Sequence, residues 1–133
     1  DYTVKSGKGS NLYSLESDFV IVYINNPGCA MCRDITTALK QSQLLSEMQR
    51  KGQLKVLAIY PDEDLNEWHK HYADIPAEWI NAYDKGCHIG RKNIHNINAI
   101  PALYLHDQAK CVLVKDSTNV GEIEFVLSQY PTR

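Results

Sequence analysis

An uninterrupted run of six apolar residues at 19–24 sets the strongest limit on the fold, because such a run is typical of a strand covered on both faces. Residues 25–28 then break the run with two asparagines, a proline and a glycine. From residue 30 to about residue 51, apolar side chains recur at roughly helical spacing, and Gly52 can end that helix. A second strand is predicted at 54–60, so residues 19–60 are predicted to form a β–α–β unit with parallel strands.

The other segments fit around this unit as parts of an α/β sandwich. A short edge strand is predicted at 3–5, short helices at 62–72 and 89–95, and a further strand at 79–83. Residues 102–105 and 111–114 are predicted to form an antiparallel hairpin, and Ser117 or Thr118 can cap a last helix. The prediction is a mixed sheet with helices on both faces, in a single domain over residues 1–133.

Composition excludes some classes of function. The formal net charge of −2 argues against nucleic-acid binding, which usually requires a basic face. No apolar run approaches membrane-spanning length. Because the chain starts at Asp1 without a methionine, we expect it to derive from a longer precursor; whether a signal, a lipid-anchor segment or another domain was removed stays open.

The chain has four cysteines, and two of them are separated by only two residues in the sequence Cys29-Ala30-Met31-Cys32. This pair falls between the first strand and the long helix. A helix N-terminus lowers the pKa of a thiol from about 8.5, so Cys29 is predicted to be the attacking nucleophile. Cys32, one turn further into the helix, is predicted to be less exposed and to act second, after a mixed disulfide has formed.

A close cysteine pair has two other possible uses. A zinc site needs about four ligands, and neither the separate Cys87 and Cys111 nor the histidines supply a second close pair. A static disulfide is the other alternative, and the position at a helix start favours redox use over both. We expect Cys87 and Cys111 to pack as small hydrophobic residues more readily than to form a disulfide, and the five histidines to lie on the surface.

Ile100 and Pro101 stand directly before the strand predicted at 102–105. One interpretation is a proline that simply opens a strand. The alternative is a cis bond that presents the backbone before Pro101 to an extended substrate beside the thiols. Met31, between the two cysteines, is predicted to be exposed and to offer an adaptable apolar contact to substrates.

These features together resemble the thioredoxin superfamily: strand, CxxC, long helix, strand, then Ile-Pro before a hairpin and a terminal helix. The N-terminal extension, Arg33 and the helix–strand insertion around 61–83 resemble the TlpA/ResA-like branch, and Asn-Pro-Gly-Cys-Ala-Met-Cys is similar to thioredoxin-like domains of secreted Bacteroidetes proteins. The resemblance implies a thioredoxin-like three-layer sandwich. It also implies Cys29 as nucleophile, Cys32 as resolving thiol and Pro101 as cis-proline.

The sequence departs from this family at two positions. Gly28 replaces the tryptophan that the family has before the first cysteine, which removes an aromatic wall from the substrate groove. Tyr23 stands where thioredoxins have a buried acid that helps to take the proton of the resolving thiol. The acceptor of that proton is therefore unassigned from the sequence.

The predicted function is that of a protein thiol–disulfide oxidoreductase, of the reductase or isomerase type, acting at Cys29 and Cys32. A thioredoxin-fold peptide-binding module without turnover and a thiol peroxidase are the alternatives; residues 23–28 lack the threonine usual in peroxidatic sites. No bound cofactor is expected, because no phosphate loop or dinucleotide fingerprint is present, and no metal is expected, because the cysteine pair has no second close pair of ligands. We expect a bacterial periplasmic or other extracytoplasmic monomer that acts on protein thiols and disulfides, with an upstream electron-donor protein and a precursor that could carry a membrane anchor.

Overall fold

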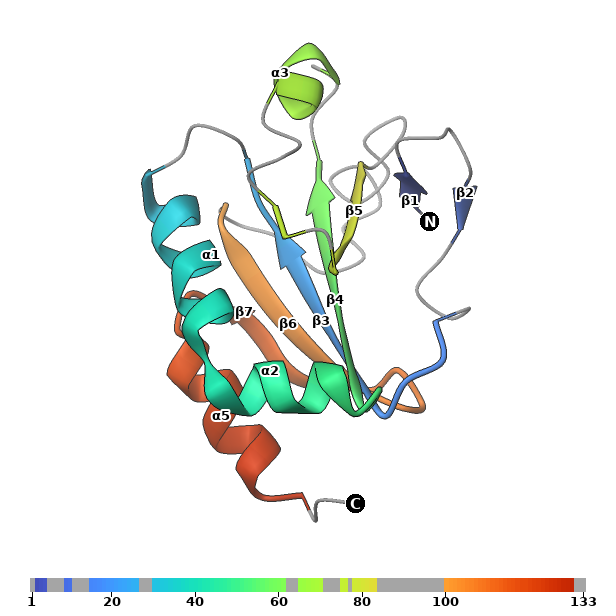
Figure 1. Cartoon of the computed structure of the whole chain (residues 1–133), viewed down its shortest axis with the longest axis vertical. Coiled ribbons are helices and arrows are strands. Elements are labelled where there is room, and N and C mark those ends of the chain that lie inside the picture. The colour runs from blue at the N-terminus through green and yellow to red at the C-terminus, as the bar shows by residue number, and fades with distance from the viewer. Residues whose placement is uncertain are drawn as a thin grey trace.

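The structure, a computed structural model, describes residues 2–4, 9–10, 15–26, 30–61, 65–70, 75–76, 78–83 and 100–130. Its strands are β1 (Tyr2–Val4), β2 (Gly9–Ser10), β3 (Phe19–Ile24), β4 (Leu54–Tyr60), β5 (Ile80–Tyr83), β6 (Ala102–Asp107) and β7 (Val112–Ser117). Its helices are α1 (Ala30–Gln41), α2 (Gln43–Arg50), α3 (Leu65–Lys70) and α5 (Val120–Ser128) (Figure 1). None of the helices in these ranges has both the length and the apolar composition to cross a membrane.

The strands within the described ranges form one mixed sheet in the order β2-β1-β5-β4-β3-β6-β7. β3 lies between β4, with which it pairs in parallel, and β6, with which it pairs antiparallel. The predicted β–α–β unit and the antiparallel hairpin of β6 and β7 are therefore confirmed. The helix predicted at 89–95 lies outside the described residues.

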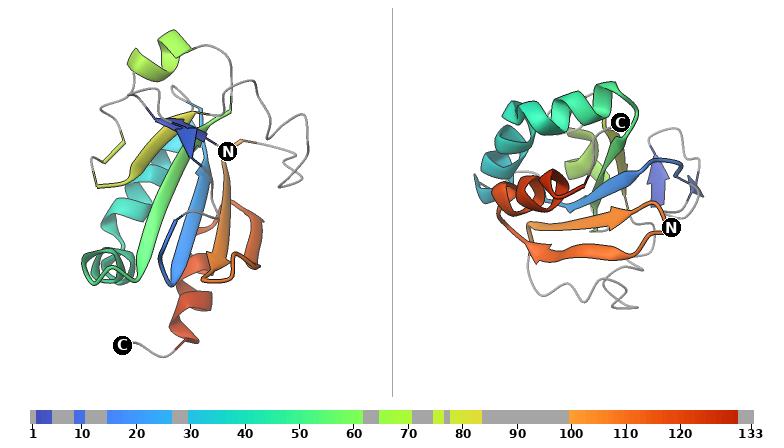
Figure 2. Two further views of the ribbon diagram at one scale, coloured as in Figure 1. Left: turned by 90° about the vertical axis from the view of Figure 1, so that its right-hand side faces the viewer. Right: turned by 90° about the horizontal axis from the view of Figure 1, so that it is seen from below.

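Alternate side chains of β3 pack on opposite faces of the sheet, as the pleat of a strand requires. Ile21 and Tyr23 join a core with apolar residues of α1, α2 and α5. Figure 2 shows these three helices on the same side of the sheet. Val20, Val22 and Ile24 join a second core on the other face. Trp68 and Trp79 are also buried.

The long helix predicted from residue 30 to about 51 is wrong in one respect, because the structure divides it at Ser42. The backbone of Ser42 is extended (φ −71°, ψ 115°), and its side chain caps α2 by accepting a hydrogen bond from the amide of Leu45. The helix direction changes at this point (Figure 1). α1 therefore runs along the sheet, while α2 crosses the end of the sheet at which β3 begins.

The predicted cap of the last helix also differs from the structure. Asn119, and neither Ser117 nor Thr118, is the N-cap of α5, because its side chain accepts from the amide of Gly121 at 2.9 Å. Ser117 instead accepts from the amide of Asn119 at 3.0 Å, which fixes the turn that leads into the helix. Short side chains that can accept hydrogen bonds occupy three consecutive positions here, so the sequence alone does not select among them.

Candidate active site at the end of the central strands

The close cysteine pair lies where the chain passes from β3 to α1. Cys29 lies outside the described residues, together with Pro27 and Gly28. Cys32 belongs to the first turn of α1, and only 5% of its surface is exposed. Cys32 is therefore buried, as the resolving thiol was expected to be, and its exposure relative to that of Cys29 stays a prediction. Met31, by contrast, is 55% exposed, as predicted.

Tyr23 lies beneath Cys32 on the strand that leads into the site. Its side chain is fully buried, and its hydroxyl donates a hydrogen bond of 2.6 Å to the backbone carbonyl oxygen of Cys32. The same hydroxyl lies 3.0 Å from Oγ1 of Thr36, one turn further along α1. These contacts could not be predicted from the sequence, in which the only sign was a phenol at the position where thioredoxins have a buried acid.

Pro101 lies at the same end of the sheet. The Ile100–Pro101 peptide bond is cis, the conformation that the resemblance implied. Pro101 itself is buried and directly precedes β6, whose first residue, Ala102, pairs with Ile24 at the end of β3. Ile100 is 38% exposed. The pairing of β3 with β6 therefore brings Pro101 and the start of the β3–α1 connection to the same end of the sheet.

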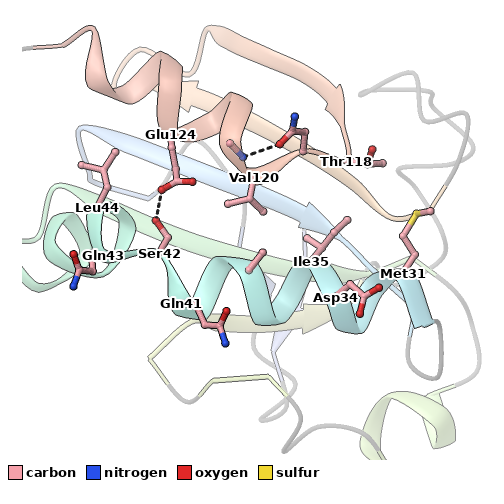
Figure 3. A pocket seen from close by; sticks show the side chains of 13 residues that line it. Met31, Asp34, Ile35, Gln41, Ser42, Gln43, Leu44, Thr118, Val120 and Glu124 are labelled. Carbon is pink, nitrogen blue, oxygen red and sulfur yellow. Dashed lines mark hydrogen bonds between the residues drawn. The ribbon is translucent and has the colours of Figure 1, made fainter.

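A groove of about 940 Å³ begins at Met31 and follows α1 to the start of α2, with the start of α5 as its other wall (Figure 3). Toward its far end, the hydroxyl of Ser42 donates to Oε2 of Glu124 at 2.9 Å. Asp34 lies near Met31 in Figure 3, and Asp34 and Glu124 are the charged side chains that line the groove. The groove has no signal in the sequence, because α1 and α5 are distant in the chain.

The other candidate residues lie apart from this site or outside the described ranges. Cys87 lies outside them, so pairing with Cys111 stays untested. Cys111 is exposed, and the expectation that it packs as a small hydrophobic residue is wrong. It follows the turn after β6, whose last residue, Asp107, pairs with Phe19 at the opposite end of β3 from Cys32. Within the described ranges, no group of three His, Cys, Asp or Glu side chains is arranged to hold a metal ion.

His106 contradicts the expectation that the histidines lie on the surface, because only 3% of it is exposed. It lies on β6, and its ring Nδ1 is 3.1 Å from the carbonyl oxygen of Lys110. Burial lowers the pKa of His106 from its ordinary 6.5, and the charge of Lys110 acts in the same direction. The hydrogen bond to Lys110 and the carboxylate of Asp107 oppose this shift in pKa. The His106 ring thus contacts the turn of the β6–β7 hairpin, and His106 pairs with Val20 at the start of β3, away from Cys32.

A mixed sheet, a cysteine in the first turn of the helix after the central strand β3, and a proline directly before the neighbouring strand β6 are together typical of a thioredoxin-type α/β fold. The chain belongs to the thioredoxin-like family, whose model matches residues 17–118. A comparison with the curated proteins found no match.

Solved structures from Bacteroides share this architecture. The C-terminal domain of an uncharacterised protein from Bacteroides fragilis is 42% identical, with a TM-score of 0.90, over 96% of this chain and 90% of that chain. A thioredoxin-like protein from Bacteroides caccae is also 42% identical, with a TM-score of 0.91, over 97% of this chain but 47% of that chain. This chain thus spans about half the length of that relative. The thioredoxin domain of a thiol-disulfide oxidoreductase from Bacteroides vulgatus is similar in fold, with a TM-score of 0.80 at 17% identity, over 97% and 91% of the two chains.

Proposed function

We propose that this chain is a protein thiol–disulfide oxidoreductase that acts through Cys29 and Cys32. The observation that supports the proposal most directly is the position of Cys32, which is buried in the first turn of the helix after β3. Pro101 precedes the strand that pairs with the end of β3. In the proposed reaction, an extended polypeptide substrate would bind at this end of the sheet, beside the two cysteines.

The proposed reaction transfers two electrons from the protein dithiol to a substrate disulfide. The Cys29 thiolate attacks one substrate sulfur, the substrate S–S bond breaks, and the released thiolate takes a proton. Cys32 then loses its proton and attacks the sulfur of Cys29, which releases the second substrate thiolate. The products are a Cys29–Cys32 disulfide and a reduced substrate, and the thiols of a donor protein would return the pair to the dithiol form.

The exposed apolar side chains near this end fit a polypeptide substrate. Met31 and Ile100 are both more than one third exposed, and each can contact side chains beside the attacked disulfide. The backbone before Pro101 can pair with an extended segment of the substrate. The groove that starts at Met31 would extend this contact, and its two carboxylates favour a neutral or basic segment.

Reduction of insulin disulfides with dithiothreitol as the electron source tests the proposal. We expect the chain to accelerate the reaction, Cys29→Ser to abolish the acceleration, and Cys32→Ser to trap a mixed disulfide on Cys29. Cys111→Ser is the matched control, because Cys111 lies at the other end of the sheet. Binding of reduced or oxidised peptides without acceleration would favour a peptide-binding module, and rapid oxidation of Cys29 by peroxide would favour a peroxidase.

We also propose that the chain acts outside the bacterial cytoplasm, as a monomer, on proteins that form disulfides there. Protein disulfides persist in oxidising compartments and are rare in the cytosol, where an exchange enzyme of this kind would have few such substrates. Cell fractionation, followed by alkylation to determine the redox state of Cys29 and Cys32, tests this. Recovery in the cytosol would contradict the proposal.

A further inference from the structure

The hydrogen bonds of Tyr23 have a defined direction. A carbonyl oxygen can only accept, so the Tyr23 hydroxyl is the donor in its 2.6 Å bond to Cys32. Because the single hydroxyl proton of Tyr23 is used in that bond, the threonine hydroxyl is the donor in the 3.0 Å contact between Tyr23 and Thr36. The result is a directed pair of bonds from Thr36 to Tyr23 and from Tyr23 to the backbone of Cys32.

This pair links a central strand of the sheet to the first turn of α1. β3 is hydrogen-bonded on both sides, by β4 and by β6. The Tyr23 ring also packs edge-on against Trp79, with ring centroids 6.4 Å apart. The first turn of a helix, in contrast, lacks intrahelical partners for its amide groups and is prone to fraying. The Tyr23 hydroxyl therefore holds the first turn of α1 to the sheet at the residue that contains the buried thiol.

We propose that Tyr23, assisted by Thr36, is a positioning residue that fixes the backbone of Cys32 for the second exchange step. This inference rests on the proposed function, since it concerns the attack of Cys32 on the Cys29–substrate disulfide. In that step the Cys32–Cys29 bond forms, the Cys29–substrate bond breaks, and the proton lost by Cys32 ends on the substrate thiol or in water. Tyr23 acts on the position of Cys32 and does not take its proton, because a phenol that still holds its own proton is not a base for a thiol.

Tyr23→Phe tests the inference, because it keeps the ring against Trp79 and removes only the hydroxyl. Correct placement of reacting groups within one molecule accelerates reaction strongly, so we expect resolution of a mixed disulfide to slow by about fivefold or more. The equilibrium constant for closing the Cys29–Cys32 disulfide against glutathione should fall by about tenfold, a rise in reduction potential of about 30 mV for a two-electron couple. Alkylation of Cys29, which reports the first step, should change by less than about twofold.

Tyr104→Phe is the matched control. Tyr104 is also fully buried, but it belongs to the core on the opposite face of the sheet. Burial, with a smaller effect from the carboxylate of Asp116, raises the pKa of Tyr104 to about 12. Tyr104→Phe, like Tyr23→Phe, therefore removes a protonated, buried hydroxyl. We expect Tyr104→Phe to leave both the resolution rate and the potential unchanged, even if it lowers the melting temperature.

Thr36 gives a second and independent variant. Thr36→Val should reproduce part of the effect of Tyr23→Phe, and Thr36→Ser, which keeps the hydroxyl, should restore wild-type resolution. Thr37→Val is the control for this pair, because Thr37 is exposed on the same helix. If Tyr23→Phe does not fold, the Thr36 series decides the question.

The failure of this inference can be told apart from the failure of the proposed function. Unchanged resolution and potential in Tyr23→Phe, or an equal change in Tyr104→Phe, would refute the positioning role while leaving the oxidoreductase intact. Absence of insulin reduction by the wild-type chain would refute the proposed function. The glutathione equilibrium needs no protein substrate, so it would still test Tyr23 in that case, and a pair that cannot close at all would refute both.

Discussion

At the scale of single residues, the two described cysteines have opposite environments, and this separates a redox candidate from a bystander. Cys32 is buried and its backbone is held by Tyr23, whereas Cys111 is exposed beside a turn. The backbone amide of Cys111 donates to Oδ1 of Asp107 at 2.9 Å, so its contribution to the turn comes from the main chain. A side-chain change at Cys111 leaves that bond in place.

We therefore predict that Cys111→Ser keeps full insulin reductase activity and changes the free energy of unfolding by less than about 0.5 kcal/mol, as is usual for surface substitutions. Cys32→Ser should lose turnover. Activity assays and urea unfolding of the two variants check this prediction. Loss of activity in Cys111→Ser, with the fold preserved, would indicate a second redox pair that includes Cys111.

A second residue-scale prediction concerns pH. The pKa of His106 is lower in the folded protein than the ordinary 6.5, so below pH 6.5 the unfolded chain takes up a proton that the folded protein resists. The free energy of unfolding should therefore fall as the pH decreases below about 6.5. His106→Asn, which keeps a nitrogen donor for the Lys110 carbonyl, should flatten this dependence between about pH 6.5 and 5. Urea unfolding at a series of pH values measures it.

His69→Asn is the control for that experiment, because His69 is exposed on α3. It should leave the pH dependence of unfolding as in the wild type. A pH dependence that is unaltered in His106→Asn would contradict the assignment of a neutral, buried imidazole.

At the scale of elements, Ser42 joins three helices. Its side chain accepts from the amide of Leu45 to cap α2 and donates to Glu124 on α5, while its position ends α1. The spacing of the apolar residues in the sequence indicates the break between α1 and α2. The step from Leu39 to Leu45 is six residues, which places the two side chains on different faces of an unbroken helix. The break restores both residues to the same core.

We predict that Ser42→Ala lowers the free energy of unfolding by about 1–2 kcal/mol, because a cap and a buried hydrogen-bond partner of Glu124 are lost together. Ser46→Ala is the matched control, since Ser46 is exposed on α2 and should cost less than about 0.5 kcal/mol. Chemical unfolding of the three proteins gives both values. Equal stability of the two variants would show that the cap and the Glu124 bond contribute nothing.

At the scale of the whole molecule, β3 contributes to both cores, so neither face of the sheet can lose its packing alone. We predict a single cooperative unfolding transition for the whole chain. Tryptophan fluorescence, from Trp68 and Trp79, should change at the same urea concentration as far-UV circular dichroism. Two separated transitions would instead indicate that the two faces unfold independently.

Much of this architecture could be predicted from the sequence, because strands and helices of this length have strong local signals. The β–α–β unit, the hairpin and the buried position of Cys32 follow from apolar runs and from one cysteine spacing. The Tyr23–Thr36 pair and the groove between α1 and α5 could not be predicted in the same way. They depend on side chains brought together by the sheet and by the turn at Ser42, and neither has a periodic pattern in the sequence.

The direction of α5 has a practical consequence for attaching the protein to a surface. The helix starts beside the groove, where Val120 is part of the lining, and ends at the opposite end of the molecule from the start of α1 (Figures 1 and 3). A tether joined after Tyr130 would therefore leave the cysteine end facing away from the support. Immobilised in this orientation, the chain should capture partner proteins from solution as mixed disulfides on a Cys32→Ser background.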